Sequence, residues 1–259
     1  MVEVSFDLKN FEYFLLILVR IASFVFAAPI FGQRGVPSRV KIGLSFFVAV
    51  LLYNSIDRPE LVYTDVIGYA VLVLGEGITG LLIGFATSIC SSIIVYAGSL
   101  IDMDIGMSMS TQFNPSMSFE TTVSGDLYYY SVMLLLMVSD FHTYILRAAC
   151  DSFVVVPVGH PNFQMDALLS SATRYIADIF TIGFRIFLPF LAVIMILNCI
   201  LGIMAKLAPQ MNMFAVGIQL KVLTGFAIMF FTAFMIPNIA DFVFREVKEM
   251  VVLFIEAMY

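Results

Sequence analysis

The stretch VIGYAVLVLGEGITGLLIGFATSICSSIIVYAGSL, residues 66–100, decides the fold class of this chain. Glu76 is its only charged residue. A helix needs about 20 mostly apolar residues to cross a membrane, so this run is long enough for more than one simple crossing. It does not alternate between apolar and polar residues, as the strands of a membrane β-barrel do. The run therefore predicts helices, because a helix away from water satisfies its own backbone hydrogen bonds.

The composition of the whole chain agrees with this interpretation. The 259 residues are 61% hydrophobic and 12% charged, whereas about a quarter of an ordinary soluble domain is charged. We therefore expect an all-α membrane protein. The formal net charge is -6, and the sequence has no basic patch with which to bind nucleic acid.

Short stretches rich in proline, glycine or charge separate the apolar regions of the chain. The regions are residues 13–31, 42–53, 66–100, 127–158, 179–207 and 211–236. Proline lacks a donor and clashes with the preceding helical turn, so the sequence predicts helical hairpins with kinks. The kinks are expected near Pro157, Pro189, Pro209 and Pro237. Because no linker or internal repeat is visible, one membrane-embedded domain is predicted for residues 1–259.

The C-terminal stretch, residues 241–259, is amphipathic. Asp241, Arg245 and Glu249 recur at four-residue steps, which places them on one face of a helix. An apolar face is formed by Val243, Val247, Met250 and Phe254. The pattern fits a helix at the membrane surface as well as a helix docked on a partner.

Charged residues inside apolar regions are the first candidate functional residues: Arg20, Glu76 and Arg185. A lone charge at the centre of a membrane helix costs about 2.5–3.5 kcal/mol, so such groups normally face a partner or water. One hypothesis is an ion pair that joins helices or subunits, in which Glu76 pairs with Arg20, with Arg185 or with a neighbouring subunit. The other hypothesis is the lining of a transport path.

Glu76 also begins a stripe of small residues. Gly80 and Gly84 follow it at four-residue steps. Such a stripe lets another helix backbone approach closely. We therefore interpret it as a packing motif.

Residues 103–122 form an unusual segment, in which methionine and phenylalanine are interleaved with serine and threonine. Gly106 would let the chain turn sharply, and Pro115 would keep it from forming another helix. Methionine fills irregular gaps and adapts to varied surfaces. The segment is therefore either a packed re-entrant loop or a deformable plug. The candidate plug residues are Gly106, Met107, Met109, Phe113, Pro115 and Met117.

The sequence contains no marked catalytic arrangement. His142 and His160 lie beside no nucleophile motif, and there is neither a phosphate-binding glycine loop nor an HExxH motif. The three cysteines lack the paired spacing of a disulfide framework or a metal site. We therefore expect no enzyme activity, no cofactor and no metal.

Several modest motifs, in a specific order and spacing, resemble the FliR family of export-gate proteins, called the SctT family in virulence-type secretion systems. The resemblance covers nearly the whole chain. The chain departs from the family pattern at four places. Asp104 stands where glutamine is common, and Asn114-Pro115 stands where Asp-Pro is frequent. Asp140-Phe141 stands where an Asn-Gly pair is usual, and Gln219 stands where proline is common. The matching motifs include Ala28-Pro29-Ile30, Val36-Pro37, Arg39-Val40-Lys41, Glu76, Gly80, Gly84, Gly106, Phe113, Pro115, Asn198, Gly202, Ala208-Pro209-Gln210 and Gly217.

The resemblance implies a multi-pass protein of the bacterial inner membrane at the flagellar basal body. Proteins of this family are similar to a fusion of FliP-like and FliQ-like units and join FliP and FliQ subunits in a hetero-oligomeric helical ring. FlhB, FlhA and membrane lipid would be further partners. The central loop would plug the channel through which unfolded flagellar proteins leave the cytoplasm. Assembly would use the packing residues Gly80, Gly84, Asn198, Gly202, Pro209 and Gln210.

Three alternatives stay open at this point. A membrane enzyme is one, but the sequence has no marked catalytic cluster. A secondary transporter for a small solute would explain charges inside apolar regions, but it predicts an internal repeat and a midplane binding site, and no repeat is visible. A virulence-type secretion system is the alternative to the flagellar one, to which the match is closer.

Overall fold

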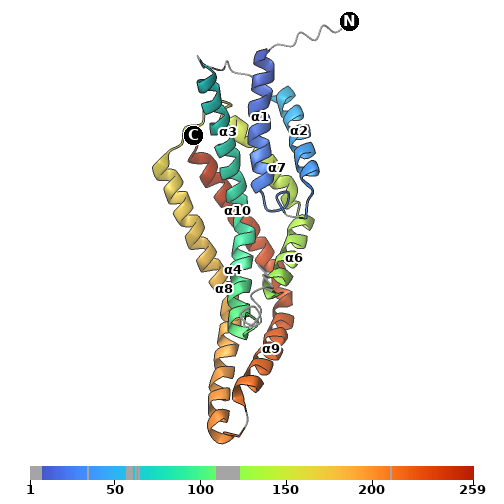
Figure 1. Cartoon of the computed structure of the whole chain (residues 1–259), viewed down its shortest axis with the longest axis vertical. Helices are drawn as coiled ribbons and strands as arrows, with labels where there is room; N and C mark the ends of the chain where they lie inside the picture. The colour runs from blue at the N-terminus through green and yellow to red at the C-terminus, as the bar shows by residue number, and fades with distance from the viewer. Residues whose placement is uncertain are drawn as a thin grey trace. The chain divides into compact units, whose positions relative to one another are not determined.

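The computed structural model describes residues 8–33, 35–56, 61, 63, 65–108, 123–210 and 212–259. Throughout these residues the regular secondary structure is helical (Figure 1). A short 3-10 helix, η1 (Ala233–Met235), follows α9. The α-helices are α1 (Leu8–Ala27), α2 (Ser38–Ser55), α3 (Val66–Thr87), α4 (Ile89–Ile105), α6 (Val123–Val138), α7 (Phe141–Val155), α8 (Met165–Leu207), α9 (Met213–Thr232) and α10 (Ile236–Glu256).

Several of these helices can cross a membrane by length and composition. A further span arises if α6 and α7, which meet at a bend of 70°, count as one broken crossing. The prediction of an all-α membrane protein is confirmed. Within the described ranges, the segments that are long and apolar enough on their own are Asn10–Ala27, Val66–Thr87, Met165–Leu207 and Ala215–Glu256.

The chain divides into two compact units. The first comprises the described residues within 1–90, 140–175 and 244–259, and the second comprises those within 91–139 and 176–243. In the first unit, α1 packs along α2 and α3. Each unit has its own buried apolar side chains, and the prediction of one domain over the whole chain stays a prediction. Examples are Leu16, Ile17 and Phe24 in the first unit, and Val132, Phe190 and Ile194 in the second.

Proline marks two helix ends, as the sequence predicts. α7 ends at Val155, shortly before Pro157, and Pro209 lies in the break between α8 and α9. Pro189 lies inside α8, which continues through it. Pro237 lies in the first turn of α10, where a proline nitrogen needs no helical partner. Kinks at these last two prolines stay predictions.

Two helix breaks carry no proline, and the hydropathy pattern did not show them. Residues 66–100 divide at Ser88 into α3 and α4, and residues 127–158 divide into α6 and α7. At the second break Asp140 has a φ of 58°. This left-handed conformation is uncommon outside glycine, but aspartate and asparagine enter it more readily than other residues do. Asp140 therefore ends one helix and begins the next without a glycine.

Candidate functional site

Arg20 is buried because it lies on the apolar face of α1. Leu16, Ile17 and Phe24 share that face at helical spacing and are fully buried. Arg20 itself is 1% exposed. A guanidinium group in such a place must find partners that replace water.

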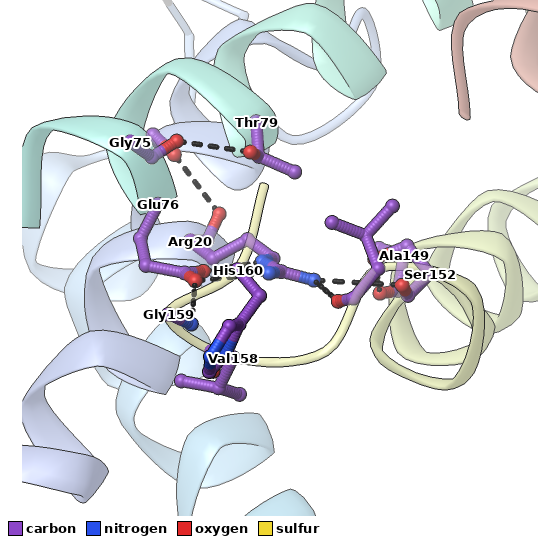
Figure 2. A network of polar contacts seen from close by, with 11 residues as sticks. Arg20, Gly75, Glu76, Thr79, Ala149, Ser152, Val158, Gly159 and His160 are labelled. Carbon is purple, nitrogen blue, oxygen red and sulfur yellow. Dashed lines mark hydrogen bonds and ion pairs between the residues drawn. The ribbon is translucent and has the colours of Figure 1, made fainter. Parts of the chain in front are cut away.

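Glu76 of α3 provides the charged partner of Arg20 (Figure 2). Arg20 Nε donates to Glu76 Oε2 at 2.5 Å, and Arg20 Nη2 donates to Glu76 Oε1 at 3.0 Å. Such a bidentate arrangement is the strongest form of carboxylate recognition by arginine. Glu76 is 0% exposed, so the whole pair lies inside the first unit.

The C-terminal end of α7 supplies further acceptors for Arg20. The last carbonyl groups of a helix have no helical donor and carry the negative end of its dipole, which favours a cation. Arg20 Nη1 donates to the Val156 carbonyl oxygen at 2.8 Å and to that of Ser152 at 3.5 Å. The guanidinium carbon also lies 4.2 Å from the ring centroid of Phe153, a cation–π contact.

The turn after α7 completes the network on the Glu76 side. The Gly159 nitrogen donates to Glu76 Oε1 at 2.8 Å. Gly159 has a φ of 81°, which glycine adopts without steric cost. Figure 2 shows this turn passing beside the carboxylate. Three segments that are distant in sequence, namely α1, α3 and α7 with its turn, thus meet at one ion pair.

The small-residue stripe on α3 lets α1 come close enough for this pairing. A Cβ atom added at Gly80 would lie 2.1 Å from the Arg20 carbonyl oxygen. A Cβ atom added at Gly84 would lie 2.5 Å from the Ala27 Cβ atom. Both separations are far shorter than real contacts of a Cβ atom. The stripe is therefore the surface on which α1 rests, as close helix packing through glycine requires.

The geometry favours a structural role for Arg20 and Glu76. Both Glu76 oxygens accept hydrogen bonds from Arg20, and one also accepts from Gly159. Because the pair is shielded from solvent and its carboxylate is fully engaged, it offers no open position for an ion or a passing polypeptide. Arg185, the third predicted residue, is exposed and belongs to the second unit.

The other predicted packing residues lie near the C-terminal end of α8. Gly202 is exposed, and a Cβ atom added there would meet nothing within 4 Å. Pro209 and Gln210 are also exposed, whereas Asn198 is half-buried. Gly202 and the turn at Pro209 therefore present an open surface in the isolated chain.

The structure describes only the beginning of the predicted plug. Gly106 follows the last residue of α4 and has a φ of 90°, so the chain leaves the helix through a conformation that suits glycine. Met107 is half-buried. The other predicted plug residues, Met109, Phe113, Pro115 and Met117, lie outside the described residues.

Sequence reasoning missed the role of Asp102 at the base of this segment. Asp102 is 3% exposed, and each of its carboxylate oxygens lies 3.3 Å from the Ser124 backbone nitrogen, which donates to them. Ser124 lies in the first turn of α6, where free N–H groups favour an anion. Asp102 and Ser124, which flank the 103–122 segment, therefore lie close together. No local pattern could predict this contact, because 22 positions separate Asp102 from Ser124.

The described residues offer no evident site for a metal. Among them, no group of three or more His, Cys, Asp or Glu side chains is arranged to hold a metal ion. Cys90 is buried, Cys150 is half-buried and Cys199 is exposed.

Comparison with known proteins gives a consistent result over most of the chain. The family described as "Bacterial export proteins, family 1" matches residues 11–247. Flagellar biosynthetic protein FliR of Bacillus subtilis (strain 168) is 30% identical over 218 residues, which cover 83% of this chain and 84% of that protein. The protein of the same name from Pectobacterium carotovorum subsp. carotovorum is 27% identical and covers 95% of this chain and 94% of its own length. That from Escherichia coli (strain K12) is 26% identical over 87% of this chain and 84% of its own length.

Proposed function

Because the chain belongs to the FliR family of bacterial export proteins, we propose that it helps to form and plug the channel of the flagellar export gate. The resemblance found in the sequence motifs is thereby confirmed, and the chain is a helical membrane component of flagellar export. The proposed cargo is unfolded flagellar protein that crosses the inner membrane at the basal body. This role requires conduction and gating and no covalent chemistry.

The large apolar surface of the isolated chain supports assembly with other membrane subunits. Apolar patches of this extent face lipid or protein partners. We therefore propose FliP and FliQ as neighbours in a hetero-oligomeric ring, with this chain resembling a fusion of the two, and FlhB and FlhA as further partners. Exposed apolar side chains on α8 and α9 include Ile196, Ile200, Ile203, Leu223, Phe226, Phe230 and Phe231.

The hydrogen bonds from Ser124 to Asp102 carry the plug proposal. They join Asp102, near the end of α4, to Ser124, at the start of α6, so the residues that flank the 103–122 segment lie close together. A loop of that kind can occupy a pore without being part of its wall. Methionine side chains repack around varied surfaces, and an apolar constriction holds back ions by excluding water. These properties suit a gate that admits an unfolded chain and stays closed at rest.

A replacement of residues 107–113 tests this proposal. We would exchange them for a Gly-Ser linker of equal length, which removes the methionines and Phe113 and keeps the chain length. The expected gate still co-purifies with FliP and FliQ but conducts ions after reconstitution into vesicles. An assembled variant gate that stays tight to ions would refute the plug. An unaltered chain that never co-purifies with FliP and FliQ would refute the gate itself.

A further inference from the structure

The second unit contains a cavity of about 230 Å³ beside the middle of α8. Most of its lining is apolar. Of the described residues that line it, Arg185 alone is charged. The apolar walls include Ile182, Ile186, Phe190, Ile239 and Phe242.

Arg185 differs from Arg20 in having no partner of its own among the described residues. In the part of the chain that the structure describes, its guanidinium group makes no ion pair and no hydrogen bond. A guanidinium group beside apolar walls is stabilised by an anion, and its planar donors suit phosphate and carboxylate groups. The cavity therefore pairs an unused cation with apolar walls.

Other polar groups line the same cavity. Pro189 carries no N–H, so the Arg185 carbonyl group lacks its usual helical donor. The Asn238 side chain also belongs to the lining. Tyr128 and Thr232 line the cavity as well, but their hydroxyl groups bond to each other at 2.7 Å. The Arg185 side chain is thus the charged group that the cavity offers to a ligand. No carboxylate among the lining residues competes for it.

We propose that this cavity binds one anionic phospholipid, with its phosphate on Arg185 and one acyl chain along the apolar walls. Charge complementarity selects an anion, and the apolar walls select an amphipathic one over free phosphate. The cavity is built from α6, α8, the end of α9 and the η1–α10 segment, and Met165–Leu207 and Ala215–Glu256 are both candidate membrane spans. These helices are therefore long and apolar enough to contact lipid. The inference does not rest on the proposed gate function.

Lipid retention by the purified chain tests the proposal. Native mass spectrometry in a neutral detergent would compare phosphatidylglycerol with phosphatidylcholine at equal concentration. We expect one phosphatidylglycerol per chain, retained about tenfold better than phosphatidylcholine, as one charge-assisted contact implies. Arg185→Gln should remove that preference. Met235→Trp, at another exposed lining residue, should lower retention of both lipids.

Arg147→Gln is the matched control, because Arg147 is an exposed arginine of α7 outside the cavity lining. It should keep the phosphatidylglycerol preference, which also shows that the loss in Arg185→Gln is not a general effect of charge. Equal preference in Arg185→Gln and the unaltered chain would overturn the proposal. So would displacement of the lipid by millimolar inorganic phosphate.

Discussion

Arg20 and Arg185 both lie within apolar helices, yet their surroundings differ. Arg20 is enclosed in the first unit, bonded to Glu76 and to the carbonyl groups that end α7. Arg185 is exposed in the second unit and lines a cavity without a partner among the described residues. A charged residue inside an apolar run can therefore have either of two roles. Where the same chain supplies the partners, the charge organises the fold, and where it does not, the charge stays available to the surroundings.

The acidic residues repeat this contrast. Glu76 accepts hydrogen bonds at both oxygens. Asp104 of the second unit is half-buried, and its Oδ2 atom has no hydrogen-bond partner among the described residues. The first unit is thus built around a saturated ion pair, and the second keeps a guanidinium group and a carboxylate oxygen that lack hydrogen-bond partners among the described residues. Four predictions test or sharpen this difference.

The largest effect is expected from Glu76→Ala, which leaves Arg20 buried without its carboxylate. Breaking a buried pair from one side costs about 3–5 kcal/mol in the free energy of unfolding. Chemical denaturation in detergent, together with the yield of assembled gate, would measure the loss. Replacing both residues with apolar ones, as in Arg20→Met with Glu76→Leu, should recover much of it.

Arg174→Ala is the matched control for an exposed ion pair. Arg174 Nη2 lies 2.5 Å from Glu249 Oε2, but the two side chains are 45% and 59% exposed. Exposed pairs contribute about 0–1 kcal/mol, so this variant should lose far less stability than Glu76→Ala. Equal losses in the two variants would contradict the contrast between buried and exposed charges.

The next effect concerns the contact between α1 and α3. Gly80→Ala would place a methyl group 2.1 Å from the Arg20 carbonyl oxygen, and overpacking of this kind costs about 1–3 kcal/mol. Gly202→Ala meets nothing within 4 Å and should stabilise α8 by about 0.5–1 kcal/mol through helix propensity. Denaturation of both variants measures the difference. A neutral Gly80→Ala would show that α1 does not rest on this stripe.

A smaller loss is expected from Asp102→Ala in the second unit. It removes the acceptor of the Ser124 N–H group, and losing such a cap costs about 1–2 kcal/mol. Amide hydrogen exchange at Ser124 and Gly125 should become faster, because these N–H groups begin α6. Asp126→Ala, also in the first turn of α6, serves as the control. Unchanged exchange in Asp102→Ala would remove the support for a loop held at its base.

The smallest effect is a pH dependence from Asp104, which lies outside the candidate membrane spans. Burial raises the pKa of Asp104 above its ordinary value of 3.8, against an opposing effect of the Lys221 charge. A carboxyl group with a raised pKa in the folded state destabilises the fold as pH rises through the interval between the unfolded and folded pKa values. Asp104→Asn should therefore increase stability at pH 7 and leave it nearly unchanged at pH 3. A variant that is less stable than the unaltered chain at pH 7 would show that the Asp104 charge is compensated.

Much of the fold could be predicted from local patterns. Hydropathy predicted helices in a membrane, and proline predicted the ends of α7 and α8, because both depend on residues that are adjacent in sequence. The spacing of Glu76, Gly80 and Gly84 indicated a close contact on α3 for the same reason. The breaks at Ser88 and Asp140 were not predictable in this way, since neither residue forbids a helix and both lie inside long, mainly apolar regions.

The sequence by itself determined the fold class, the family and the set of charged residues that needed partners. Only the tertiary structure decided which partners they have. The desolvation cost of Arg20 is the same whether it is offset by Glu76, by another subunit or by water, so the sequence left these choices open. The packing of α1 on glycines of α3, and the place where α7 ends, bring Glu76 and the carbonyl groups of Ser152 and Val156 to Arg20. No such arrangement reaches Arg185, because partner choice depends on where distant helices lie in space.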